Sequence, residues 1–90
     1  MDPDIHKMTY FATFFSHFGA TRYKQLCEAA GIPCRVMPVP RELSSSCGTC
    51  VRCEGRWLRP EGETAEDVEQ VAAWDGARYT TVYHVDEKED

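Results

Sequence analysis

The sequence predicts an α+β fold, a ferredoxin-like β-α-β-β-α-β sandwich in which an antiparallel sheet carries two helices on one face. Three observations lead to this fold class. Four segments rich in aromatic, Thr and Val residues are typical of strands, two segments have apolar residues at helical spacing, and turns containing Gly or Pro separate them. A chain of 90 residues has room for one small core. We therefore expect a single domain over residues 1–90, with a structured core at residues 8–85.

The first half of the chain predicts strand, helix and strand. Residues 8–15 are rich in aromatic and Thr residues, which favours a central strand. Ser16 can cap the helix that follows, and Gly31 and Pro33 end it. Its apolar stripe consists of Ala20, Tyr23, Leu26, Cys27 and Ala30. Residues 34–39 then form a second strand, which Pro38 and Pro40 stop.

The second half predicts strand, helix and strand again. Residues 49–53 start a third strand, and residues 59–63 form a turn. Thr64 and Asp67 resemble a capping box. They precede a second helix with the apolar positions Ala65, Val68, Val71 and Ala72, and Gly76 ends it. Residues 78–85 alternate as a fourth strand, with Tyr79, Thr81, Tyr83 and Val85 on one face.

This order has a consequence for Cys47. A crossover through the first helix makes the first two strands parallel, so both end at one edge of the sheet. The loop over residues 38–48 leaves from that edge, and the first helix begins there. Cys47 can therefore face a helix N-terminus, with His17 and Arg41 nearby, and these groups favour the thiolate.

Composition narrows the classes of function. The net charge is −5, which argues against nucleic-acid binding. Residues 10–15, the longest apolar stretch, are too short to span a membrane, and the acidic N-terminus is unlike a signal peptide, so we expect a cytoplasmic protein. Residues 86–90 read as an acidic, solvating tail. The arginines of residues 35–59 fit a solvated face or a patch that docks an anion or a partner equally well.

The five cysteines are expected to be free thiols. Cys47 follows two prolines and a run of serines and precedes Gly48, a setting that exposes a reactive thiol. Cys50 and Cys53 complete a Cys-x-x-Cys-x-x-Cys run, whose spacing suits a metal or thiol–disulfide exchange. Cys34 could be a fourth ligand, although it fits a small core residue better, as does Cys27.

The conformation of residues 49–53 separates these alternatives. In an extended strand Cys50 points away from Cys47 and Cys53, which then lie up to about 20 Å apart at about 3.3 Å per residue. In a turn all three thiols can converge on one ion. A strand therefore favours a carrier thiol, and a turn favours a metal site.

Residues 29–33 and 35–48 resemble the selenium/sulfur carrier protein-like family of small bacterial proteins, and we expect the similarity to run from about residue 10 to residue 83. The specific part is a Pro-x-Pro-Arg segment followed by Ser-Cys-Gly. The resemblance implies a carrier that holds sulfur or selenium as a persulfide or perselenide on Cys47. Pro38, Pro40, Arg41 and Gly48 match the surrounding motif. This chain departs from the family pattern by the extra thiols Cys50 and Cys53, which could resolve the persulfide.

Three hypotheses follow. The first is a cytoplasmic carrier of sulfur or selenium that works between a donor and an acceptor protein, and we expect a carrier rather than an enzyme with independent turnover. Its site residues are Cys47, the possible resolving thiols Cys50 and Cys53, and the thiolate-supporting Arg41 and His17. The second is a zinc or iron–sulfur module on Cys47, Cys50, Cys53 and Cys34, although no cofactor is favoured. The third is a protein-interaction domain. No nucleic acid or membrane is expected as a partner, and a homodimer remains open.

Overall fold

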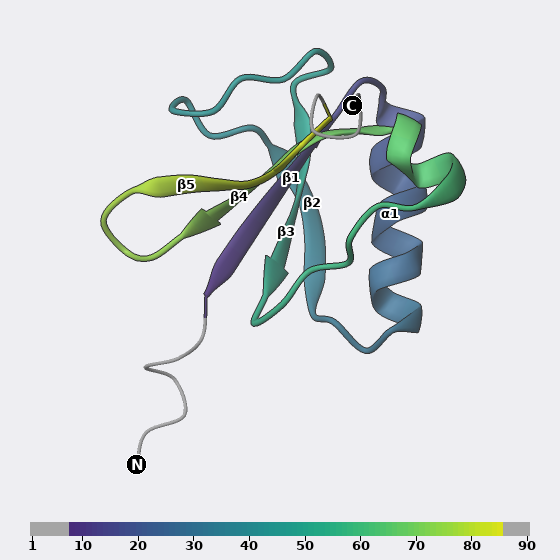
Figure 1. The fold of residues 1–90 in the computed structure, drawn as a ribbon, viewed down its shortest axis with the longest axis horizontal. Coiled ribbons are helices and arrows are strands. Elements are labelled where there is room, and N and C mark those ends of the chain that lie inside the picture. The colour runs from purple at the N-terminus through teal and green to yellow at the C-terminus, as the bar shows by residue number, and fades with distance from the viewer. Residues whose placement is uncertain (1–7, 86–90) are drawn as a thin grey trace.

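The computed structural model describes residues 8–85, which form a five-stranded antiparallel sheet with one α-helix against one face (Figure 1). The strand order is β2-β3-β1-β4-β5. In chain order the elements are β1 (Thr9–Phe14), α1 (His17–Ala29), β2 (Cys34–Pro38), β3 (Thr49–Glu54), the 3₁₀ helix η2 (Gly62–Glu66), β4 (Val68–Trp74) and β5 (Tyr79–His84).

The first half of the prediction is confirmed. The Ser16 hydroxyl accepts a hydrogen bond from the backbone N–H of Gly19 at 3.2 Å and caps α1 as expected. The strand β3 lies between β1 and β2 and is antiparallel to both. Therefore β1 and β2 run in the same direction, and the loop after β2 leaves the sheet at the end where α1 begins.

The ferredoxin-like prediction is wrong, because the second predicted helix does not form. Residues 62–66 make only the short helix η2, and the chain then enters β4, which pairs with β1. An irregular register between Thr13 and Phe14 explains the misleading spacing. Phe14 pairs with Val68 and Ala12 pairs with Val71, so two valines three residues apart both face the core. A bulged strand here imitates the apolar spacing of a helix.

Gly76 ends no helix but lies in the tight turn between β4 and β5. Its φ of +98° is in the left-handed region that glycine adopts without a steric penalty. The Asp75 carboxylate accepts hydrogen bonds from the backbone N–H groups of Ala77 and Arg78, at 2.8 and 3.0 Å. The resulting hairpin pairs β5, which matches the strand predicted over residues 78–85, with β4, the strand that the two-helix prediction did not contain.

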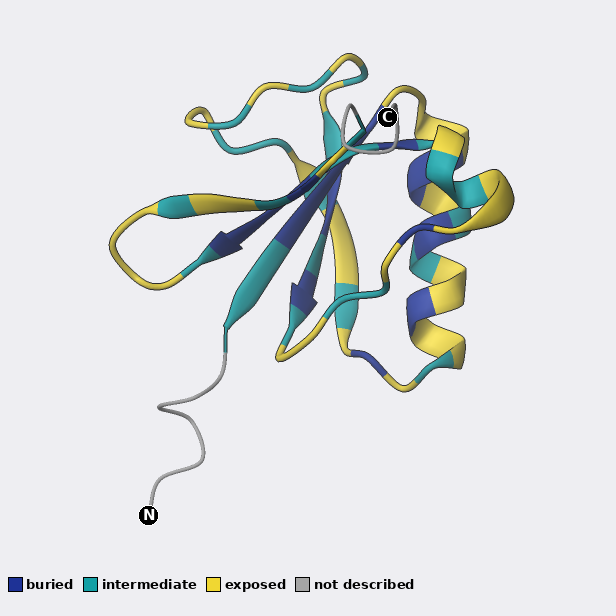
Figure 2. Ribbon diagram, in the orientation of Figure 1, coloured by how far each residue is buried: buried dark blue, intermediate teal, exposed yellow. Residues whose placement is uncertain are grey.

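The core fills the space between α1 and the sheet. Buried positions lie on the central strands and on one side of α1 (Figure 2). The connection from β3 to η2 closes this core, because the Tyr23 hydroxyl donates to the Leu58 carbonyl at 2.7 Å and accepts from the Leu58 N–H at 3.1 Å. Trp57 of the same connection packs against Tyr10 and Tyr83, with ring centroids 6.3 and 6.2 Å apart.

The start of α1 is fixed to the segment before β4. A Cβ atom on Gly19 would lie 2.8 Å from the Cβ of Asp67, so this close approach requires glycine. The Arg22 guanidinium binds the Asp67 carboxylate at 2.8 Å and Glu63 at 3.0 Å. No helix among residues 8–85 is both long enough and apolar enough to cross a bilayer. The predicted acidic tail over residues 86–90 lies outside the described residues.

Candidate functional site

The loop over residues 39–48 connects the edge strand β2 to β3 and carries Cys47. A hydrogen bond from the Val39 N–H to the Gly48 carbonyl, at 3.1 Å, closes its base. The loop projects from the top of the sheet in Figure 1, on the side away from α1. It includes the positions singled out in the sequence, from Pro40 and Arg41 to Gly48.

Three serines attach this loop to the sheet. The Ser45 hydroxyl donates to the Phe14 carbonyl at the end of β1, at 3.1 Å. The Ser46 N–H and hydroxyl donate to the two Glu69 carboxylate oxygens on β4, at 3.0 and 2.6 Å. The Ser44 carbonyl accepts from the Gln70 side chain at 3.3 Å. The backbone on either side of Cys47 is thus held in place, although the loop has no regular secondary structure.

The Cys47 side chain is half-buried at the edge of the core. Its thiol donates to the Thr49 carbonyl at 3.6 Å, and the Ser45 hydroxyl lies 4.0 Å from the sulfur as a donor. Cys47 therefore has polar neighbours and remains partly exposed.

His17 lies at the same corner, as the predicted topology required. Its Nδ1 is 2.8 Å from the Thr49 hydroxyl, and Thr49 also accepts the Cys47 hydrogen bond through its carbonyl. Within residues 8–85, His17 and Cys47 are therefore linked by hydrogen bonds only through Thr49. Arg41 is exposed at a turn of the loop and makes no hydrogen bond or ion pair within residues 8–85. The predicted support of a Cys47 thiolate by His17 and Arg41 remains a prediction.

Cys50 is buried on the sheet face that the loop covers. Its thiol donates to the Pro38 carbonyl at 3.7 Å. Burial raises the pKa of this thiol to about 11, and the neighbouring Cys47 adds to the shift. Thr13, the β1 partner of Cys50, is also fully buried, and its hydroxyl has no hydrogen-bond partner among the described residues. The side chains of Cys50 and Thr13 therefore lie in a buried region beneath the loop.

Cys53 lies at the other end of β3 and on the opposite face. Its sulfur is 3.8 Å from that of Cys27 on α1, and both side chains are fully buried. Cys34 pairs with Cys53 across β2 and β3 and is half-buried, whereas the sequence suggests a core residue. Residues 49–54 are extended, so Cys50 faces away from Cys53. The four sulfurs of the alternative metal site are not brought together, and no group of three or more metal-ligating side chains occurs within residues 8–85.

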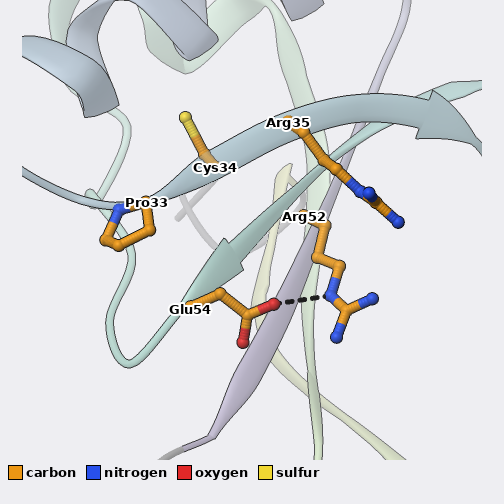
Figure 3. A pocket seen from close by; sticks show the side chains of 5 residues that line it. All are labelled: Pro33, Cys34, Arg35, Arg52 and Glu54. Carbon is orange, nitrogen blue, oxygen red and sulfur yellow. Dashed lines mark ion pairs between the residues drawn. The ribbon is translucent and has the colours of Figure 1, made fainter.

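Two features of this region were missed by sequence reasoning. The first is Glu69, which binds Ser46 and lies where the sequence predicts a helix. The two residues are 23 apart, so no local sequence pattern indicates their contact. Arg35 and Arg52 are direct neighbours on β2 and β3 and line a cavity of about 350 Å³ (Figure 3). The Arg52 guanidinium forms an ion pair with Glu54 at 2.7 Å. This cavity lies toward the far end of β3 from Cys47, so these arginines are not part of the Cys47 site.

A family model described as "Putative Se/S carrier protein-like" matches residues 9–83. The match includes the Cys47 loop and all five strands, except for His84 at the end of β5. Comparison with curated proteins gave no match, and comparison with solved structures gave none either. The resemblance inferred from the residues around Cys47 is confirmed at the level of the family. The chain belongs to the Se/S carrier protein-like family.

Proposed function

We propose that this protein carries a single sulfur or selenium atom as a persulfide or perselenide on Cys47, between a donor protein and an acceptor protein. The observation that supports it most is the position of Cys47, which is the one loop thiol among residues 8–85. Cys27, Cys50 and Cys53 are fully buried, and Cys34 lies within a strand. A carrier thiol needs both access to a partner and a defined position, and the attached loop meets both requirements.

Loading is a transfer without net oxidation. The Cys47 thiolate attacks the outer sulfur of a persulfide on the donor, and a new S–S bond forms while the donor S–S bond breaks. The donor leaves as a thiolate, which takes up the proton that Cys47 lost. The transferred atom keeps its oxidation state, so no additional oxidant or reductant is required. Selenium follows the same sequence with a perselenide.

The neighbours of Cys47 suit this step. The Ser45 hydroxyl, which donates to the Phe14 carbonyl, lies 4.0 Å from the Cys47 sulfur and would exchange that partner to donate to a terminal sulfur anion. His17 contacts Thr49 behind the thiol. Arg41 is exposed on the same loop and can contact an acidic donor or acceptor surface. Cys50 is the remaining candidate for a resolving thiol near Cys47, although its burial makes it a weak nucleophile at neutral pH.

Intact-mass measurement after incubation with a persulfide donor tests this function. We expect one added chalcogen atom on the wild-type protein, and reduction should remove it. Cys47→Ser should abolish loading, whereas Cys50→Ser, a matched change at a buried thiol three residues away, should leave it unchanged. Equal loading of Cys47→Ser, or no loading of the wild type, would exclude Cys47 as the carrier thiol. Full biological activity after replacing Cys47, Cys50 and Cys53 together by serine would favour a pure interaction domain.

A further inference from the structure

A second group of thiols lies beneath α1, away from Cys47. Its members are Cys27 of α1, Cys34 of β2 and Cys53 of β3. The sulfurs of Cys27 and Cys53 are 3.8 Å apart, and Cys34 is directly opposite Cys53 across the strand pair. All three are free thiols in this structure. Two consecutive elements, α1 and β2, and the later strand β3 therefore bring three oxidisable sulfurs together at the edge of the core.

Access to this group is unequal. Cys27 and Cys53 have no exposed surface, whereas Cys34 is half-buried on the edge strand β2. Figure 3 shows the Cys34 thiol on the opposite side of β2 from the Arg35 guanidinium. The thiol donates to the Lys24 carbonyl of α1 at 3.7 Å, so it lies on the helix side of β2, away from the Arg35 side chain. A small reagent can reach Cys34 before it reaches the other two.

We propose that Cys27, Cys34 and Cys53 form an oxidation site, in which Cys34 reacts first with a small peroxide and the oxidation ends as a Cys27–Cys53 disulfide in the core. This inference does not depend on the function of Cys47. It explains why two buried thiols are in direct contact, since a packing role alone would be met by any small apolar side chain.

The chemistry balances in three steps. The Cys34 thiolate attacks one peroxide oxygen, the O–O bond breaks, and Cys34 becomes a sulfenic acid while the other oxygen leaves as water with a proton. The Cys27 thiol then attacks the Cys34 sulfur, an S–S bond forms, and the hydroxyl leaves as a second water with the Cys27 proton. Finally Cys53 attacks the Cys27 sulfur and returns Cys34 to the thiol form. Two thiols lose two electrons in total, and the peroxide is reduced to two waters.

The test uses the full chain with Cys47→Ala, so that the carrier thiol cannot take part. After treatment with hydrogen peroxide and alkylation of the remaining thiols, peptide mass mapping should find a Cys27–Cys53 disulfide, with Cys34 and Cys50 alkylated. Adding Cys34→Ser should slow disulfide formation about tenfold or more, because the reagent must then enter the core. Adding Cys53→Ala should instead trap a Cys27–Cys34 disulfide.

The control is Cys50→Ser, since Cys50 is as buried as Cys27 and Cys53 but lies on the other face of the sheet. It should leave both the rate and the identity of the disulfide unchanged. Circular dichroism checks that each variant is folded before oxidation. Four free thiols after complete consumption of the peroxide, or equal rates with and without Cys34, would overturn the proposal. Because every sample lacks Cys47, failure here leaves the carrier function intact, and failure of chalcogen loading leaves this site intact.

Discussion

At one end of β3, Cys47 lies in a loop with an exposed side and polar neighbours, whereas at the other end Cys53 is buried against Cys27 beneath α1. The first thiol is held by hydrogen bonds to serines and strand ends, and the second by apolar packing. The same residue type is thus prepared for contact with a partner at one end and isolated from partners at the other. A strand of six residues is enough to separate the two environments.

The largest difference should appear in thiol labelling. Under native conditions an alkylating reagent should modify Cys47 about a thousandfold faster than Cys27 or Cys53, because labelling the buried pair requires an opening that costs about 4 kcal/mol. Timed alkylation followed by peptide mass mapping measures both rates in one sample. Rates within a factor of about ten of each other would show that the two ends are not separated as described.

Loosening the core should reduce this difference. Tyr23→Phe leaves both the Leu58 N–H and carbonyl without their partner, and we expect the free energy of unfolding to fall by about 2 kcal/mol. Labelling of Cys27 and Cys53 should rise about thirtyfold, and that of Cys47 should stay the same. The matched control is Tyr79→Phe, whose lost hydroxyl has no hydrogen bond with any residue in the described range. An equal effect of both substitutions would contradict the role given to Tyr23.

The pH dependence of stability tests whether Cys50 resembles the buried thiols or the loop thiol. The pKa of Cys50 is raised from 9.0 to about 11, so the folded state keeps the proton that the unfolded chain loses above pH 9. The resulting stability is fully present below pH 9 and is lost as the pH rises to about 11, by an amount on the order of 2 kcal/mol. Cys53 and Tyr23, whose pKa values are also raised, act in the same direction.

Denaturant unfolding of wild type and Cys50→Ala across this range isolates the Cys50 contribution. The variant should lose stability less steeply with rising pH. Equal slopes would mean that water reaches Cys50 and that the space beneath the loop resembles the loop surface more than the core.

The smallest expected effect is on the loop itself. Glu69→Ala removes both acceptors of Ser46, a loss of about 1 kcal/mol, and should increase labelling of Cys47 about fivefold. Labelling of Cys27 and Cys53 should not change. Glu66→Ala, an exposed substitution in η2, serves as the control. If Glu69→Ala also exposed Cys27, the loop and the core would not be independent.

Local signals made the first half of the fold predictable. Ser16 and Gly31 bound α1, and two prolines end β2, so each boundary has a cause within a few residues. The second half depends on pairing with β1. The valines of β4 have helical spacing only because the register shifts between Thr13 and Phe14, and the sequence of β4 does not contain that information.

The contacts of the site also divide into those that the sequence predicted and those that it did not. Parallel β1 and β2 place His17 near Cys47, and this followed from the order of the elements. The contact of Ser46 with Glu69 joins residues 23 apart, and that of Cys27 with Cys53 joins residues 26 apart. The first contact depends on β4, which the two-helix prediction lacked, and the second on how α1 packs against β3, which the spacing of the cysteines does not show. Cys53 was therefore grouped with Cys47 by its spacing, although it belongs with Cys27 by its position.

The edge strand β2 also affects whether copies of this protein aggregate. An unpaired strand edge offers backbone groups that can recruit a second chain, and Val36 on this strand is well exposed. Pro33, Pro38 and Pro40 interrupt the series of amide donors before, within and beyond β2. Replacing these prolines would therefore lengthen the unpaired strand edge and promote aggregation, even without a change at any cysteine.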